Sequence, residues 1–307
     1  MLNNLAPIGL SVYARSQHLH KAIEALKKNS LALHSELYAF SDAPRPGDER
    51  KVEAVRSYLR TIDGFRKVHI IEREKNDRVA NSRGGLKMLL DRFGKVIFLA
   101  EDIVTAPGFL TFMNEALNKY ERNSDIFNIS GYCPPIKIPT DYQHDIFTLR
   151  RISAWGFGIW KNRFDQIRYM TVDEFEEFAN DKRKVQNFVE AGGRDLLVML
   201  KSDAYGVIDA GDVKLMYAQF LSDQYTIYPT MSLVQNIGHD GTGVHCGETD
   251  RFKVTLSDKT TFVLPHKPVI DPRIVKANRK FRNGNKLKKV HSRVTGRARR
   301  LIKKLVD

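Results

Sequence analysis

Two adjacent carboxylates end the most apolar short segment of the sequence. Residues 95–99 read Lys-Val-Ile-Phe-Leu, and Ala100, Glu101 and Asp102 follow directly. Neighbouring carboxylates repel each other unless a cation or hydrogen-bond donors compensate them. A hard divalent ion, Mn²⁺ or Mg²⁺, needs one or two such oxygens and can take its other ligands from phosphates and water. The alternative is that both acids only end a strand and cap the helix that follows.

A second candidate carboxylate, Asp195, follows two glycines and an arginine, Gly192-Gly193-Arg194, where we expect a helix to begin. Glycines allow a close approach to substrate. A helix N-terminus favours the ionised form, which suits a general base but makes it weaker. The alternative is an ordinary first-turn residue, and the other candidates for the base are Asp203, Asp209 and Asp212.

Two basic side chains are candidates for binding phosphate. Arg15 precedes a helix expected to begin near Ser16, so it would share an anion site with free backbone N–H groups. His245 lies in the glycine-rich loop 238–245 and is a candidate ligand for a metal or a phosphate. A lone arginine after a strand is more often solvated, and a loop histidine more often lies on the surface.

The elements that must position these residues alternate between strand and helix patterns. We expect strands at 8–14, 37–40, 68–71, 95–99 and 126–130, with amphipathic helices between them. This order predicts an α/β fold with a mostly parallel sheet covered on both faces. The carboxyl ends of its strands then meet at one edge, where ligands bind. After Gly131 the pattern changes, and we expect a β-rich stretch at 252–264.

Composition excludes several classes of protein. The 307 residues are 42% hydrophobic and 28% charged, so the chain can bury a core. No apolar run approaches the ~18 residues that a membrane span needs. No signal peptide is evident. Two cysteines far apart, Cys133 and Cys246, indicate no disulfide framework. We therefore expect a cytoplasmic location.

The excess positive charge is concentrated at one end. Residues 273–307 hold fourteen basic residues and one acid, so they carry +13 and leave +1 for residues 1–272. A basic amphipathic tail is typical of binding to an anionic membrane surface. Nucleic acid is the alternative partner. The nearly neutral body and the single aromatic residue of the tail, Phe281, argue against it. A disordered solubilising tail is the third option.

In these motifs and their order the sequence resembles the GT-A nucleotide-sugar glycosyltransferases, in the branch related to N-acetylglucosaminyltransferase I. The resemblance covers most of residues 6–250 and implies a GT-A fold. The resemblance implies that five segments bind the donor; their residues are Tyr13, Arg15, Asp42, Asn81, Glu101, Asp102 and, in a closing loop, His245. It places the metal on Asp102 and the base on Asp195. Ala100 and Asn81 depart from the family pattern, which leaves the donor sugar open.

From the resemblance we expect an inverting, metal-dependent glycosyltransferase. It would move a sugar from a nucleoside-diphosphate sugar to a glycan or lipid-linked acceptor in cell-surface polysaccharide synthesis. We expect a donor-binding region at 1–132, an acceptor and catalytic region at 133–272 and the tail at 273–307. The tail would hold the enzyme at the inner face of the membrane. The other hypotheses are a nucleic-acid-binding α/β protein and a sugar-nucleotide-binding protein without catalysis.

Overall fold

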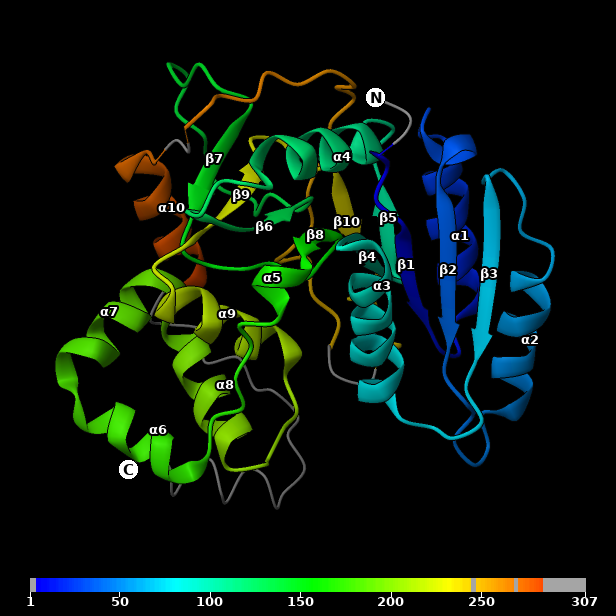
Figure 1. Cartoon of the computed structure of the whole chain (residues 1–307), viewed down its shortest axis with the longest axis horizontal. Coiled ribbons are helices and arrows are strands. Elements are labelled where there is room, and N and C mark those ends of the chain that lie inside the picture. The colour runs from blue at the N-terminus through cyan, green and yellow to red at the C-terminus, as the bar shows by residue number, and fades with distance from the viewer. Residues whose placement is uncertain (1–3, 244–246, 268–269, 284–307) are drawn as a thin grey trace.

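The computed structural model describes residues 4–243, 247–267 and 270–283, and it is built around a mixed sheet of eight strands (Figure 1). The strands follow the order β3-β2-β1-β4-β8-β6-β9-β7. Their bounds are β1 Ile8–Val12, β2 Glu36–Ser41, β3 Lys67–Glu72, β4 Lys95–Ala100, β6 Ile126–Ser130, β7 Ile146–Leu149, β8 Phe157–Trp160 and β9 Tyr225–Pro229. β3, β2, β1 and β4 run parallel, whereas β8 and β7 run antiparallel to their neighbours. The predicted α/β fold with a mostly parallel sheet is confirmed.

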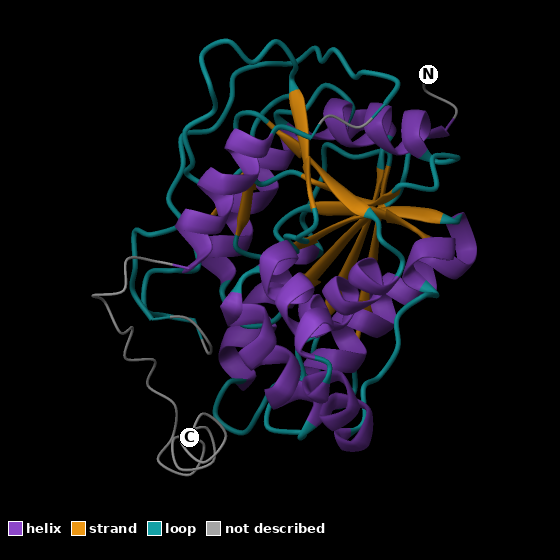
Figure 2. Cartoon of the chain, turned by 90° about the vertical axis from the view of Figure 1, so that its left-hand side faces the viewer, coloured by secondary structure: helices purple, strands orange, loops and turns teal. Residues whose placement is uncertain are grey.

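Helices cover both faces of this sheet (Figure 2). The described helices are α1 Ser16–Lys27, α2 Glu49–Leu59, α3 Gly85–Phe93, α4 Phe109–Tyr120, α5 Lys161–Phe164, α6 Val172–Asn180, α7 Lys182–Gly192, α8 Arg194–Ala204, α9 Gly211–Leu221 and α10 Pro272–Asn283. Apolar residues of α1, α2 and α4 share one core cluster with the sheet. Those of α3, α5 and α9 share the other. Burial on two faces explains the apolar run Val96–Leu99 of β4, and all five residues of β6 are buried as well.

Helices α6 to α9 form a compact group beside the sheet (Figure 1). Phe175, Phe178 and Phe188 pack there with Leu196 and Met216 in a core of their own. Edge-to-face contacts between the rings add to the burial of their apolar area. This group carries Asp195, at the first turn of α8.

A small second sheet brings a late loop back to the main sheet. β5 Ile103–Thr105 pairs antiparallel with β10 Val234–Asn236. Three-residue strands have too little pattern to be seen in the sequence. Their pairing holds the chain after Asn236 against the turn that contains Asp102, where the backbone N–H of Ile237 donates to the carbonyl of Asp102 at 2.9 Å.

The expected β-rich stretch at 252–264 is wrong: these residues contain no strand. Their alternating apolar side chains, such as Val254 and Phe262, pack against the core as an extended loop. Their N–H groups bond to isolated acceptors instead of a neighbouring strand, as in Val254 to the side chain of Gln235. The alternation of apolar residues in 252–264 therefore reflects burial of one side of this segment and not its pairing with another strand.

Part of the predicted basic tail is folded onto the body. α10 begins at Pro272 and packs its buried Ile274 among Phe147 and Tyr228 at the β7 end of the sheet. Residues 284–307 lie outside the described residues, as do His245 and Cys246. Cys133 is a buried free thiol. Among the described helices, none has the length and the apolar character needed to cross a membrane.

Candidate functional site

A cavity of about 500 Å³ opens at the carboxyl ends of β1, β2 and β4. This is the edge at which a mostly parallel sheet binds ligands. Its lining includes five of the residues predicted to bind the donor: Tyr13, Arg15, Asp42, Asn81 and Glu101. Four basic side chains face it as well; they are Arg15, Arg45, Lys51 and Arg78. Thr242 and Gly243 of the late loop complete the wall. Parallel strands thus bring together Tyr13 and Glu101, which are 88 positions apart.

Glu101 joins the loop after β1 to the end of β4. One carboxylate oxygen accepts the backbone N–H of Tyr13 at 2.6 Å, and the other accepts Nε of Arg15 at 2.9 Å. Glu101 is only 5% exposed, so both bonds compensate a buried charge. Its position fixes the course of residues 13–15 along the cavity.

Asp102 is ion-paired and mostly enclosed. Its Oδ2 accepts Nη2 of Arg15 at 2.7 Å, and 13% of its side chain is exposed. Asp102 itself does not line the cavity, but Arg15 does. Burial lowers the pKa of Arg15, but the hydrogen bond that Arg15 donates to Glu101 and the charge of Asp102 outweigh it and raise that pKa. Gly238 packs against this pair, because a Cβ there would lie 2.2 Å from Oδ2 of Asp102.

Asp42 and Asn81 are buried polar residues in the cavity wall. Asp42 accepts the backbone N–H of Ala43 and of Asp77 and the side-chain amide of Asn76. It therefore organises the loops after β2 and β3. Asn81, in the π-helical turn Ala80–Gly84, donates to the carbonyl of Phe40 at 2.9 Å, while its Oδ1 has no partner. A buried polar atom without a partner is costly, and a ligand in the cavity could satisfy it.

The sequence analysis missed His239. This residue follows Gly238 in the late loop, and both of its ring nitrogens are buried without a hydrogen-bond partner. Its ring packs against Trp155 and Phe252. Burial lowers the pKa of His239, while the charge of Asp102 opposes that shift, so the two side chains are electrostatic neighbours. Only the unforeseen β5–β10 pairing brings the loop there. His245, which was singled out instead, lies outside the described residues.

The possible metal ligands near Asp102 among the described residues do not form a complete cage of protein side chains, but they fit a cation that is also bound by a diphosphate. Within residues 4–243, 247–267 and 270–283, no three His, Cys, Asp or Glu side chains are grouped as a metal cage. Asp102 would supply one carboxylate ligand, and the nearby His239, whose ring nitrogens have no hydrogen-bond partner, would supply a second. Mn²⁺ or Mg²⁺ commonly takes its remaining ligands from a bound diphosphate and water. The residues therefore fit a cation that arrives with a phosphate ligand.

The predicted base, Asp195, forms a two-point ion pair. Its Oδ1 and Oδ2 accept Nη1 and Nη2 of Arg151 at 2.9 and 2.7 Å. Arg151 also donates to the carbonyl of Gly192. The side chain of Asp195 is 44% exposed, so it remains accessible. A carboxylate in a two-point pair with arginine is a poor proton acceptor until a substrate displaces the guanidinium.

The other three candidates for the base, Asp203, Asp209 and Asp212, differ in their ion pairs. Asp203 and Asp209 both pair with Lys214, and Asp209 also pairs with Arg83. The side chain of Asp212, at the start of α9, is exposed. Desolvation raises the pKa of Asp212, against a bond from the N–H of Val213 and the charge of Arg151. A raised pKa makes a carboxylate a stronger base.

No protein-family model matches the chain, and no curated protein is similar to it in sequence. Solved structures share its fold weakly. They include S. aureus TarS (TM-score 0.40, 8% identity, 82% of this chain and 41% of that one). Others are the galactosyltransferase LgtC with donor and acceptor sugar analogs (TM-score 0.37, 9% identity, 70% of each chain) and GalNAc-T7 with UDP, GalNAc and Mn²⁺ (TM-score 0.43, 9% identity, 74% of this chain and 43% of that one). Glycosyltransferases are thus among its structural neighbours. At these TM-scores no residue role or substrate carries over from them.

Proposed function

We propose that this protein is an inverting, metal-dependent glycosyltransferase that uses a nucleoside-diphosphate sugar. The observation that carries the proposal is the cavity at the ends of β1, β2 and β4. There a carboxylate turn, a helix N-terminus and four basic side chains surround a space of about 500 Å³. A diphosphate needs such cations, and the free N–H groups of α1 add to them.

In this proposal the chain's residues divide the work. Arg15 and the N-terminus of α1 hold the diphosphate, and Asn81 and the loop ordered by Asp42 hold the nucleoside or sugar. Asp102, with His239, would bind Mn²⁺ or Mg²⁺, which offsets the charge of the leaving nucleoside diphosphate. Tyr13 shapes the wall, since its hydroxyl donates to Asp48 and accepts the N–H of Arg45.

The base must take a proton from the acceptor hydroxyl as its oxygen attacks the anomeric carbon. Two carboxylates act electrostatically on Arg151: Asp195, which is paired with it, and Asp212. Asp195 becomes free to accept a proton when the acceptor replaces it as the partner of Arg151. Asp212 has no ion pair among the described residues and has the raised pKa. We propose Asp195 as the base, with Asp212 as the competing candidate.

The wider context is also a proposal. Residues 1–132 would bind the donor and 133–272 the acceptor, which would be a glycan or a lipid-linked molecule of the cell surface. The basic residues of 273–307 would hold a cytoplasmic enzyme against the anionic inner face of the membrane.

The test is donor binding and hydrolysis with and without Mn²⁺. Calorimetric titration with a panel of nucleoside diphosphates should show binding that strengthens at least about tenfold with Mn²⁺, and Asp102→Asn should remove that increment. Asp91→Asn, which changes an exposed acid of α3, is the matched control. Equal affinity of wild type and Asp102→Asn would count decisively against the metal site.

A further inference from the structure

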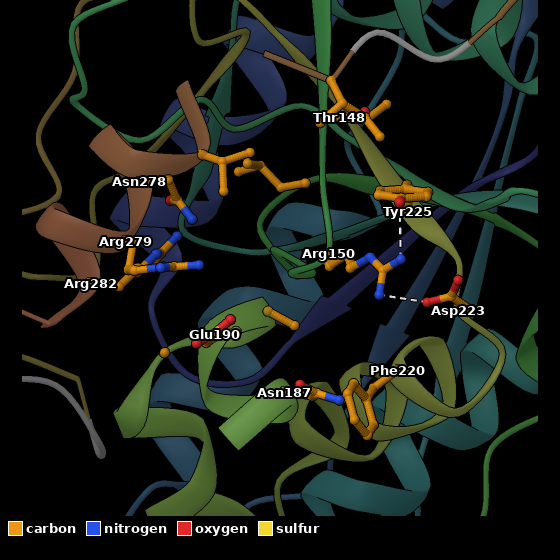
Figure 3. Close-up of a pocket in the computed structure, with 16 residues that line it drawn as sticks. Thr148, Arg150, Asn187, Glu190, Phe220, Asp223, Tyr225, Asn278, Arg279 and Arg282 are labelled. Atoms are coloured by element: carbon orange, nitrogen blue, oxygen red, sulfur yellow. Dashed lines mark hydrogen bonds and ion pairs between the residues drawn. The ribbon is translucent and has the colours of Figure 1, made fainter. Parts of the chain in front are cut away.

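A second cavity, of about 510 Å³, lies at the β9–β7 edge of the sheet (Figure 3). It is enclosed by α7, α9 and α10 and by β7 and β9. Its lining is notable for three arginines, Arg150, Arg279 and Arg282. Nothing in the proposed donor chemistry uses this cavity.

Two of the arginines come from α10 and reach toward the centre of the cavity in Figure 3. Arg282 forms no ion pair with a carboxylate of the described residues, and its Nε is buried without a partner. Burial and the positive charge of Arg151 lower the pKa of Arg282 to about 10. The charge of Asp195 acts on Arg282 without a direct ion pair, and it does not offset the burial. An enclosed cation without a directly paired carboxylate is unfavourable, so an anion beside Arg282 would be stabilised.

Asn278 supplies an independent observation. It lies one turn before Arg282 on α10 and is only 5% exposed, and its Oδ1 is buried without a hydrogen-bond partner. Such a buried amide calls for a ligand, because polar groups inside proteins are nearly always paired. A ligand that carries both an anionic group and a hydroxyl would satisfy Arg282 and Asn278 together.

The other charged residues that line the cavity do not neutralise Arg279 and Arg282. Arg150 is neutralised by Asp223 and donates to the hydroxyl of Tyr225 at 3.0 Å. Glu190 on α7 accepts the amide of Gln186 and pairs with no basic residue of the described chain. Arg279 is exposed and likewise has no acidic partner there. Among the described residues that line the cavity, Arg279 and Arg282 thus lack an ion pair, and the only carboxylate that also lacks one is that of Glu190.

The cavity ends at the proposed base. Gly193 lines it, and a Cβ at that position would lie 2.6 Å from Oδ1 of Asp195 and 3.1 Å from Nη1 of Arg151. The same Cβ would lie 3.4 Å from Cβ of Arg282. A molecule held by Arg282 is therefore next to the Arg151–Asp195 pair, with only a glycine backbone between them.

We propose that this cavity binds an anionic group, a phosphate ester or a carboxylate, of the acceptor, with Arg279 and Arg282 as its cations. An anion there would also attract Arg151 electrostatically across the backbone of Gly193, which would loosen its hold on Asp195. The assignment of this anion to an acceptor rests on the proposed function. The binding of an anion in the cavity does not depend on the proposed function.

The test titrates the full-length chain with glycerol 3-phosphate and, separately, with glucuronate at low ionic strength; glycerol is the neutral control. Arg282→Gln should weaken binding of the preferred anion at least about tenfold, as expected for a charge-assisted hydrogen bond. Lys280→Gln removes the same charge from an exposed position of α10 and should leave the affinity unchanged. If Arg282→Gln does not fold, the exposed Arg279→Gln carries the test.

Unchanged affinity in both arginine variants, or no binding of either anion, would overturn the inference. Nucleoside-diphosphate binding is measured apart, because it reports on the other cavity. If the anion binds through Arg282 but no sugar is transferred, the anion site stands and the transferase proposal falls. If sugar is transferred equally to acidic and neutral acceptors, and Arg279→Gln leaves the acceptor KM unchanged, the acceptor assignment falls.

Discussion

Arg15 and Asp102, 87 positions apart in the sequence, share an ion pair of 2.7 Å between Nη2 and Oδ2, and the same guanidinium bonds to Glu101 at 2.9 Å. The pair occupies a carboxylate oxygen that a divalent cation would need. Arg15 also lines the cavity that is proposed to bind the diphosphate. In the proposed site Arg15 would therefore couple metal and diphosphate binding, because a phosphate that pairs with Arg15 would release Asp102 for the metal.

This coupling predicts opposite effects in Arg15→Gln. Mn²⁺ alone should bind more tightly, because Asp102 is released, while a nucleoside diphosphate should bind about tenfold or more weakly, because a charge-assisted bond is lost. Calorimetry measures both. Arg60→Gln, which removes an exposed arginine directly after α2, should change neither affinity. A parallel loss of both affinities would mean that Arg15 only supports the local fold.

Gly238 provides a steric test of the same turn. In Gly238→Ala the new Cβ would meet Oδ2 of Asp102 at 2.2 Å and Nη1 of Arg15 at 2.8 Å, so both side chains must shift. Overpacking of this kind costs about 1–3 kcal/mol, and we expect a tenfold or larger loss of Mn²⁺-dependent donor binding. Gly211→Ala at the start of α9 meets no atom within 4 Å and should preserve binding. A fully active Gly238→Ala variant would show that the Arg15–Asp102 geometry does not matter.

The sequence predicted the strands and helices of the N-terminal part of the fold because local signals specify them. Strands 37–40 and 95–99 are apolar runs that end in polar residues, and parallel pairing necessarily brings their ends to one edge. His239 could not be predicted, because its place depends on the antiparallel pairing of β5 with β10, which has no periodic signal. The partnership of Arg151 with Asp195 joins residues 44 positions apart across irregular chain. Such contacts are set by packing, not by local pattern.

Two variants distinguish the candidate bases. If Asp212 accepts the proton, Asp212→Asn should reduce kcat by a factor of at least about 100, with little change in the KM of the donor. Its raised pKa means that the protonated form persists to higher pH than in an ordinary aspartate, so activity should fall as the pH drops through that raised value. Because the folded state disfavours the ionised form, Asp212→Asn should also raise Tm at pH 7.

If Asp195 is the base, Asp195→Asn should instead cause the loss of kcat, and Tm at pH 7 should fall because the ion pair with Arg151 is broken. Asp165→Asn, which breaks an exposed ion pair with Lys161 outside both cavities, is the control. Full activity in both Asp195→Asn and Asp212→Asn would exclude a carboxylate from this part of the chain as the base.

The proposed membrane contact requires a truncation that spares α10. Residues 284–307 hold nine basic residues and one acid, whereas α10 is anchored by Ile274 and carries Arg282 into the second cavity. A chain that ends at Asn283 should therefore fold and hydrolyse the donor normally but lose binding to vesicles rich in anionic lipid. At about 1 kcal/mol per basic residue near the surface, the loss should exceed a hundredfold.

Flotation with vesicles of anionic and of neutral lipid measures this loss. A full-length chain with the nine basic residues changed to Gln separates the effect of charge from that of chain length. Equal flotation of the wild type and the truncated chain would remove the membrane from the proposal, whereas a truncation at Pro272 would confound the result by taking Arg282 away from the Arg151–Asp195 pair.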